Sequence, residues 1–180
     1  MKKTVLTFGL IAGAIMSILM SVSIQFHDRI GFEKGLVIGY TIMVAAFLLI
    51  YFGIRSYRDN AGGGTIGFGR AFAIGMLITA VAGVLYTATW EVMYFNFMPD
   101  FDKQYIEHAV DRARASGKSD AEVAQVRAEQ EKNFANYKNP VVNSAYTFLE
   151  PLPVGFIVSL VSAGILSRKR RTRDPALARA

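Results

Sequence analysis

Long runs of apolar residues dominate this chain and fill about half of it. A run of about 18 or more such residues is long enough to cross the hydrocarbon of a bilayer as a helix. The runs are Thr4–Phe26, Gly35–Ile54, Ala71–Trp90 and Val154–Ser167, the last extended backward by Val141–Pro153. The pattern therefore predicts an all-α polytopic membrane protein with four transmembrane helices, at about residues 4–26, 35–54, 71–92 and 143–167.

The first run also resembles a secretory signal, because Lys2 and Lys3 precede it and Ser21-Val22-Ser23 could serve as a cleavage site. It is, however, longer than the about 7–15 apolar residues of a signal-peptide core. We therefore expect it to be retained as the first transmembrane helix.

Residues 98–139 form the only long polar segment between two apolar runs. Pro99 suits the start of a helix that ends near Gly117, and Ser119-Asp-Ala-Glu122 has the spacing of a capping box that opens a second helix. Asn139-Pro140 would end that helix. We expect an αα-hairpin that caps the outer end of the bundle, with mixed charges on a solvated surface.

The charge of the chain, +6, is concentrated near the ends of the apolar runs. Arg168, Lys169, Arg170, Arg171 and Arg173 begin a basic tail, residues 168–180, that would anchor the last span and attract anionic lipid headgroups. Basic residues close to the spans favour the side that holds both termini and the second loop. The prediction is a bacterial inner-membrane protein with cytoplasmic termini, and the candidate polar residues on that side are Arg55, Arg58, Asp59 and Arg70.

Two carboxylates near the outer ends of the spans are the strongest candidates for chemistry. Glu91 follows Trp90, and Glu150 lies in a segment where Pro151 and Pro153 should break or kink the helix. Charged groups near hydrocarbon usually face the protein interior and find a partner. We expect a candidate intramembrane polar cluster made of Glu91, Glu150, Arg29 and Lys34. Its role would be structural pairing or proton or ligand handling, and the alternative is an ordinary location of the carboxylates at the level of the lipid headgroups.

Small residues recur every four positions within the apolar runs, a spacing that lets membrane helices approach closely. They would pack helices within one molecule or between copies. The candidate packing glycines are Gly9, Gly13, Gly35, Gly39, Gly75, Gly83 and Gly155.

Other functional classes have little support in the sequence. The absence of cysteine excludes disulfides and thiolate chemistry. Gly62-x-Gly64-x-x-Gly67 matches a dinucleotide fingerprint, but a membrane helix rather than a buried strand precedes it. His27 and His108 lack the spacing of a metal helix. We expect no cofactor, no metal, no nucleic-acid partner and no enzymatic activity.

Six ordered motifs together resemble a bacterial membrane family, the domain of unknown function numbered 4199. The likeness covers essentially the whole chain and implies a small four-span inner-membrane protein without an established activity. Arg55, Asp59, Arg70, Glu91 and Glu150 fall within the motifs, but the family assigns them no catalytic role. The motifs are Ile30–Gly35, Tyr51–Asn60, Gly62–Phe72, Trp90-Glu91, Asn96–Phe101 and Phe148–Gly155.

Two functional hypotheses remain open at this point. The first is a non-enzymatic scaffold or accessory subunit, with membrane lipids and a second copy or another membrane protein as partners. The second is a small oligomeric transporter or proton-linked channel that uses Glu91 and Glu150. A continuous polar path would favour transport, whereas a closed bundle would favour the scaffold.

Overall fold

The computed structural model describes residues 1–25 and 31–168, and within them the chain is helical without a strand. Arg29, His27 and most of the basic tail lie outside the described residues. The helices are α1 (Lys2–Gln25), α3 (Phe32–Asn60), α4 (Phe68–Phe97), α5 (Phe101–Ala115), α6 (Asp120–Tyr137), α7 (Pro140–Leu149) and α8 (Pro151–Leu166).

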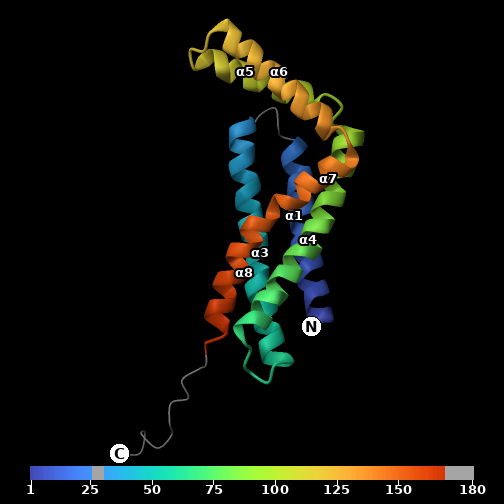
Figure 1. The fold of residues 1–180 in the computed structure, drawn as a ribbon. Coiled ribbons are helices and arrows are strands. Elements are labelled where there is room, and N and C mark those ends of the chain that lie inside the picture. The colour runs from blue at the N-terminus through green and yellow to red at the C-terminus, as the bar shows by residue number, and fades with distance from the viewer. Residues whose placement is uncertain (26–30, 169–180) are drawn as a thin grey trace, which may run out of the picture.

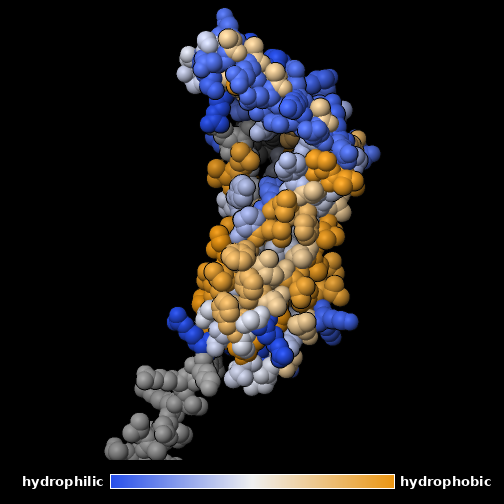
Figure 2. Space-filling view, in the orientation of Figure 1, coloured by the Kyte–Doolittle hydropathy of each residue, from blue (hydrophilic) through white to orange (hydrophobic). Residues whose placement is uncertain are grey.

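Four long apolar helices form the body of the molecule (Figure 1). The prediction of an all-α protein with four such helices is confirmed, and the segments long and apolar enough to cross a membrane are Lys2–Gln25, Lys34–Asn60, Phe68–Phe97 and Pro140–Leu166. Figure 2 shows an apolar band over the bundle, between the polar α5–α6 segment at one end and polar residues at the opposite end. We call these the hairpin end and the loop end.

The middle of the bundle is a closed hydrophobic core. α4 packs against α1, α3 and α8, and α3 also contacts α1 and α8. Phe47 and Ile50 of α3 and Ile74 and Ile78 of α4 are fully buried between the helices. Because lipid supplies no hydrophobic force between helices, close packing of these side chains must hold the bundle together.

A regular register aligns α4 with α8 and α7. A Cβ added to Gly75 would lie 2.8 Å from Ser159 Cβ, one added to Gly155 would meet Thr79, and one added to Gly83 would lie 3.7 Å from Pro151 Cγ. Moving four residues forward along α4 therefore corresponds to moving four residues backward along the antiparallel α8. We call this interface the α4 seam.

α7 and α8 are two parts of one span, separated at Glu150. α7 begins at Pro140, where the side chain of Asn139 caps the helix by accepting a hydrogen bond from the Val141 amide. The helix is interrupted at Glu150 and resumes at Pro151. Proline has no N–H, so the carbonyl one turn earlier loses its usual donor at this point.

The polar segment between the third and fourth spans is a helical hairpin of α5 and α6. Gly117, with φ +78°, ends the first helix, and Ser119 and Glu122 form the capping box that opens the second. Ile106, Val110, Ala113 and Val123 form a small core between them. Arg127 donates two hydrogen bonds, of 2.8 and 2.9 Å, to the Glu107 carboxylate and ties the two helices together.

Candidate functional site

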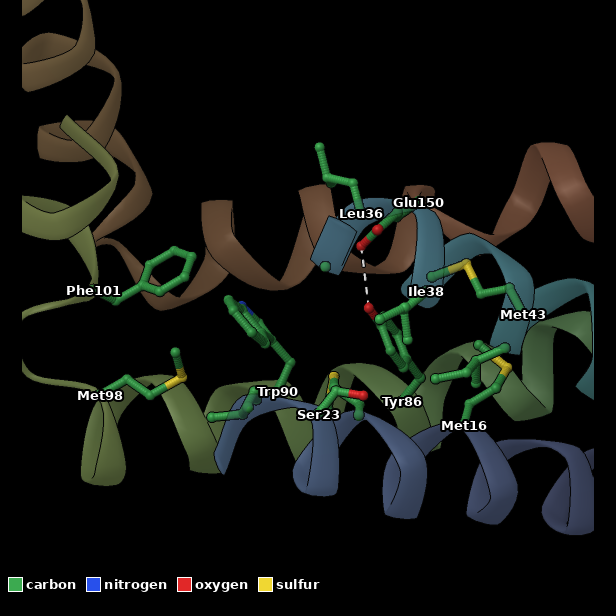
Figure 3. A pocket seen from close by; sticks show the side chains of 15 residues that line it. Met16, Ser23, Leu36, Ile38, Met43, Tyr86, Trp90, Met98, Phe101 and Glu150 are labelled. Carbon is green, nitrogen blue, oxygen red and sulfur yellow. Dashed lines mark hydrogen bonds between the residues drawn. The ribbon is translucent and has the colours of Figure 1, made fainter. Parts of the chain in front are cut away.

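A cavity of about 200 Å³ lies at the hairpin end of the bundle (Figure 3). Its walls come from α1, α3, α4, the start of α5 and the break at Glu150, and they are mostly apolar. Of the described residues that line the cavity, only Glu150 has a charged side chain. The lining residues are Met16, Met20, Ser23, Ile24, Gly35, Leu36, Ile38, Gly39, Ile42, Met43, Tyr86, Trp90, Met98, Phe101 and Glu150.

Tyr86 and Glu150 meet across this cavity. The phenol of Tyr86 donates a hydrogen bond of 3.3 Å to Glu150 Oε2. Tyr86 is buried on α4, and Glu150, between α7 and α8, is half-buried. A carboxyl group in a mostly apolar cavity needs such a donor, since burial without a partner costs free energy.

The hairpin end of the α4 seam is polar. α4 contacts α7 beyond Gly83, and extending the register by the same steps of four predicts that Thr87 lies opposite Thr147 and Glu91 opposite Asn143. Asn143 is fully buried, and its Nδ2 group has no hydrogen-bond partner among the described residues. Within the same described part of the chain, Glu91 Oε1 and Thr87 Oγ1 are also buried without a partner. The extended register therefore predicts that a buried amide donor and a buried carboxyl acceptor face each other.

A chain of hydrogen bonds joins the bundle to the hairpin. The indole of Trp90 donates to Tyr137 Oη at 3.0 Å, and Tyr137 Oη lies 3.5 Å from Thr147 Oγ1. Thr147 in turn donates to Asn143 Oδ1 at 3.3 Å. Burial raises the pKa of Tyr137, whereas its hydrogen bonds with Thr147 and Trp90 act in the opposite direction.

The structure describes three of the four residues of the predicted intramembrane cluster, namely Glu91, Glu150 and Lys34. Glu91 and Glu150 are both half-buried at the hairpin end, where Glu91 Oε1 has no hydrogen-bond partner among the described residues and Glu150 lines the cavity. Lys34 is exposed at the start of α3 and forms no ion pair with either described carboxylate. Arg29 lies outside the described residues. The described partner of Glu150 is the phenol of Tyr86 rather than a cation.

Sequence reasoning missed Tyr86 and Asn143. Tyr86 lies within an apolar run and resembles an ordinary core aromatic residue, but it precedes Glu91 by five positions in the same helix. Asn143 lies one helical turn before Thr147 in the segment that leads to Glu150. The signal that could have found Asn143 is an amide inside a predicted span, because such groups usually hydrogen-bond to another helix.

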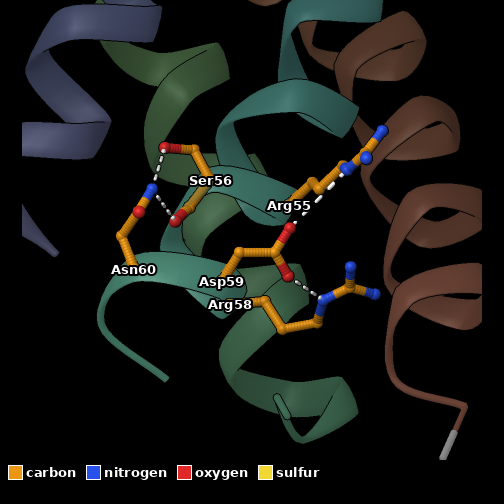
Figure 4. A network of polar contacts seen from close by, with 5 residues as sticks. All are labelled: Arg55, Ser56, Arg58, Asp59 and Asn60. Atoms are coloured by element: carbon orange, nitrogen blue, oxygen red, sulfur yellow. Dashed lines mark hydrogen bonds and ion pairs between the residues drawn. The ribbon is translucent and has the colours of Figure 1, made fainter. Parts of the chain in front are cut away.

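The polar residues at the loop end form a separate group (Figure 4). Asp59 lies 3.6 Å from Arg55 and 2.8 Å from Arg58, measured between carboxylate oxygen and guanidinium nitrogen. Asn60 Nδ2 donates to the Ser56 carbonyl at 2.9 Å and helps to end α3. Arg70 is exposed and lines a separate cavity beside the glycine-rich loop. These contacts fix the end of α3 and lie a full span away from Glu150.

The predicted packing glycines divide into two sets. A Cβ on Gly9 would lie 2.7 Å from Val81 Cβ, and one on Gly13 would lie 3.1 Å from Ala82 Cα, so both face α4. Gly75, Gly83 and Gly155 belong to the α4 seam. Gly35 and Gly39 have open space where a Cβ would be, and they line the first cavity instead.

The polar cluster lies near one boundary of the apolar band. At 1.5 Å per residue, α4 rises about 33 Å from Phe68 to Trp90, which is close to the ~30 Å of a bilayer's hydrocarbon core. Glu150 lies about 27 Å along the helix from Arg168 by the same measure. A carboxyl group at that depth can hold a hydrogen-bonding or cationic group, or exchange a proton. Among the described residues, no group of three His, Asp or Glu side chains could hold a metal ion.

Fold and site together define a multi-pass helical membrane protein with a polar cluster at one end of its bundle. The chain belongs to a family of proteins of unknown function, DUF4199, whose model matches residues 7–168. That match confirms the resemblance stated above from the six motifs. No curated protein and no solved structure matches the chain.

Proposed function

We propose that this protein is a non-enzymatic scaffold or accessory subunit of the bacterial inner membrane, which works through helix packing against a membrane partner. The observation that carries the proposal is the closed middle of the bundle. It is filled by the buried side chains of Phe47, Ile50, Ile74 and Ile78. The cavity beside Glu150 ends at Met16 and Met43, which are also buried. Apolar side chains therefore fill the middle of the described bundle beyond the end of this cavity.

The outward face of α3 is a candidate contact surface for the partner. Leu36, Val37, Val44 and Leu48 are exposed there, and a shallow groove runs between them. The small side chains of Thr41 and Ala45 lie four residues apart along this groove. Such small residues let a second helix approach closely in the membrane. A second copy of the chain or another membrane protein would fit this face.

The sidedness that we propose rests on charge. The N-terminus lies at the loop end (Figure 1). The segments at this end carry five basic residues, which are Lys2, Lys3, Arg55, Arg58 and Arg70. Basic residues close to span ends favour the cytoplasm. We therefore propose that the loop end and both termini lie in the cytoplasm and the α5–α6 hairpin outside.

A photo-crosslinking amino acid at Val44, in the native membrane, tests the proposal. We expect a discrete crosslinked protein of defined mass, whereas a crosslinker at Val161 should give none above background. Val161 is a matched control because it is similarly exposed on α8. Crosslinks only to lipid at both positions would contradict a scaffold that uses this face.

Proton-linked transport is the second candidate, and the cavity around Glu150 favours it. Such a function would need an oligomer or a second conformation, because the core of one copy is closed. Proteoliposomes with a pH-sensitive dye inside would detect proton movement. If the protein transports protons, the native protein should give a proton flux that is lost in Glu150→Gln. The flux should remain in Glu131→Gln, a variant at an exposed position of the hairpin. The scaffold predicts no flux in any of the three proteins.

A further inference from the structure

A second cavity, of about 460 Å³, lies where the hairpin meets the bundle. Its volume is within the about 300–1,000 Å³ that is typical of small-molecule sites. Figure 2 shows the molecule hollowed in this region, beneath the polar hairpin. The lining residues come from α4, α5, α6 and α7, and they are Trp90, Phe101, Tyr105, Gln130, Asn133, Phe134, Asn136, Tyr137 and Tyr146.

The described lining consists of aromatic rings and carboxamides, and none of these described residues has a charged side chain. Gln130, Asn133 and Tyr137 are three and seven residues apart and therefore share one face of α6. The side chains of Gln130 and Asn133 form no hydrogen bond with another described residue. Each carboxamide offers donors and an acceptor, and each ring offers an apolar face.

This composition selects among ligand classes. A phosphate or carboxylate group would need a cation or a cluster of donors beside it, and the lining supplies no cation. A purely apolar ligand would displace water from the half-buried Gln130 without replacing its hydrogen bonds, which weakens binding. A pyranose ring meets both demands, because its C–H faces stack on aromatic rings while its hydroxyl groups exchange hydrogen bonds with amides.

The position of the cavity suggests how such a ring could be presented. Trp90 and Phe101 line both this cavity and the mostly apolar one beside Glu150. Trp90 lies at the boundary of the apolar band, so a lipid chain in the first cavity would bring its headgroup to the second. A free saccharide could also enter, since Tyr105 and Tyr146 at the rim are exposed.

We propose that the cavity between the hairpin and the bundle binds the pyranose ring of an uncharged saccharide, either as the headgroup of a glycolipid or free. Rings of Trp90, Phe101 and Tyr137 stack against the sugar, and Gln130 and Asn133 bind its hydroxyl groups. This site is independent of the contact surface on α3.

Trp90 is the only tryptophan in the chain and reports directly on the site. The test uses the full chain, purified in a detergent without sugar and placed in nanodiscs of phosphatidylethanolamine and phosphatidylglycerol. Three probes are titrated while Trp90 fluorescence is recorded: monoglucosyl diacylglycerol, methyl glucoside, and diacylglycerol without sugar. We expect a saturable change with the glucosyl lipid and none with diacylglycerol. A response to methyl glucoside at similar concentrations identifies a free saccharide as the natural source.

Two variants separate hydrogen bonding from non-specific insertion. Gln130→Ala and Asn133→Ala should each raise the Kd for the glucosyl lipid about tenfold, the usual effect of one lost hydrogen bond. Gln125→Ala should leave the Kd unchanged, because Gln125 is exposed on the same helix and does not line the cavity. Circular dichroism checks that the variants keep their helix content. An equal response to diacylglycerol, no response to either sugar probe, or equal affinities in Q130A and Q125A would overturn the proposal.

Discussion

Tyr86 donates a hydrogen bond of 3.3 Å to Glu150, and this bond joins the third span to the break in the fourth. Tyr86→Phe leaves the ring in the core but removes the donor. We expect the variant to lose about 1–3 kcal/mol of stability, because the carboxyl group keeps its burial and loses its partner. Thermal unfolding in detergent measures the loss.

The matched control for Tyr86→Phe is Tyr146→Phe. Tyr146 is exposed and makes no side-chain hydrogen bond to another described residue. Its variant should unfold within about 0.5 kcal/mol of the native protein, as is usual for surface substitutions. Equal stability of the two variants would show that the bond to Glu150 contributes nothing.

Glu91 and Asn143 at the end of the α4 seam should be energetically coupled. Asn143→Leu leaves the buried carboxyl group facing an apolar side chain, and we expect a loss of about 1–3 kcal/mol. Adding Glu91→Met should recover most of that loss, because two apolar residues can replace a buried polar pair at little cost. A double-mutant cycle by thermal unfolding measures the coupling, and simple additivity would contradict the register.

Close approach at Gly155 makes the α4 seam sensitive to a single methyl group. A Cβ there would overlap Thr79, whereas a Cβ on Gly164 of the same helix would meet open space. Gly155→Ala should cost about 1–3 kcal/mol, the usual effect of overpacking. Gly164→Ala should be neutral or slightly stabilising. Thermal unfolding of the two variants compares them, and equal losses would show that the helices are not in close contact at Gly155.

Helix count and seam residues could be predicted from the sequence, whereas the partners of the carboxylates could not. Run length alone gives four spans, because hydrocarbon thickness fixes the helix length. Gly75, Gly83 and Gly155 carry a spacing signal, and Ser119 with Glu122 carries a capping signal, since both patterns are local.

The polar cluster escaped sequence reasoning because its contacts join distant segments. Whether Glu150 meets Tyr86 or Lys34 depends on the rotation of α4 and on the direction of the break at Pro151. Neither is encoded in a local pattern. The sequence favours Arg or Lys as the partner of a carboxylate in an apolar run. A neutral phenol can also donate a hydrogen bond to the carboxylate, and its burial does not require a second charge to lose its hydration.

The hairpin should loosen in acid. Hydrogen bonds and charge from Arg127 lower the pKa of Glu107 below its ordinary value of 4.5. A lowered folded pKa means that the stabilisation is present above that ordinary value and is lost as pH falls through the folded pKa. Hydrogen exchange of α5 and α6 amides, corrected for intrinsic rates, should therefore quicken between about pH 6 and about pH 3.

Arg127→Gln should make this exchange less dependent on pH, because the acid then has no cation to lose. Lys132→Gln removes a positive charge from an exposed position on the same helix and should keep the native pH dependence. If both variants behave alike, the acid sensitivity arises from overall charge rather than from the pair.

Sidedness is directly testable because the chain has no cysteine of its own. Gln125→Cys places a thiol on the hairpin, and Ala61→Cys places one in the loop that follows α3; both positions are exposed. The basic residues Arg55, Arg58 and Arg70 near the loop favour its retention in the cytoplasm. A membrane-impermeant maleimide added to intact cells should therefore label position 125 at once and position 61 only after permeabilisation. The reverse order would invert the orientation, and the saccharide cavity would then face the cytoplasm.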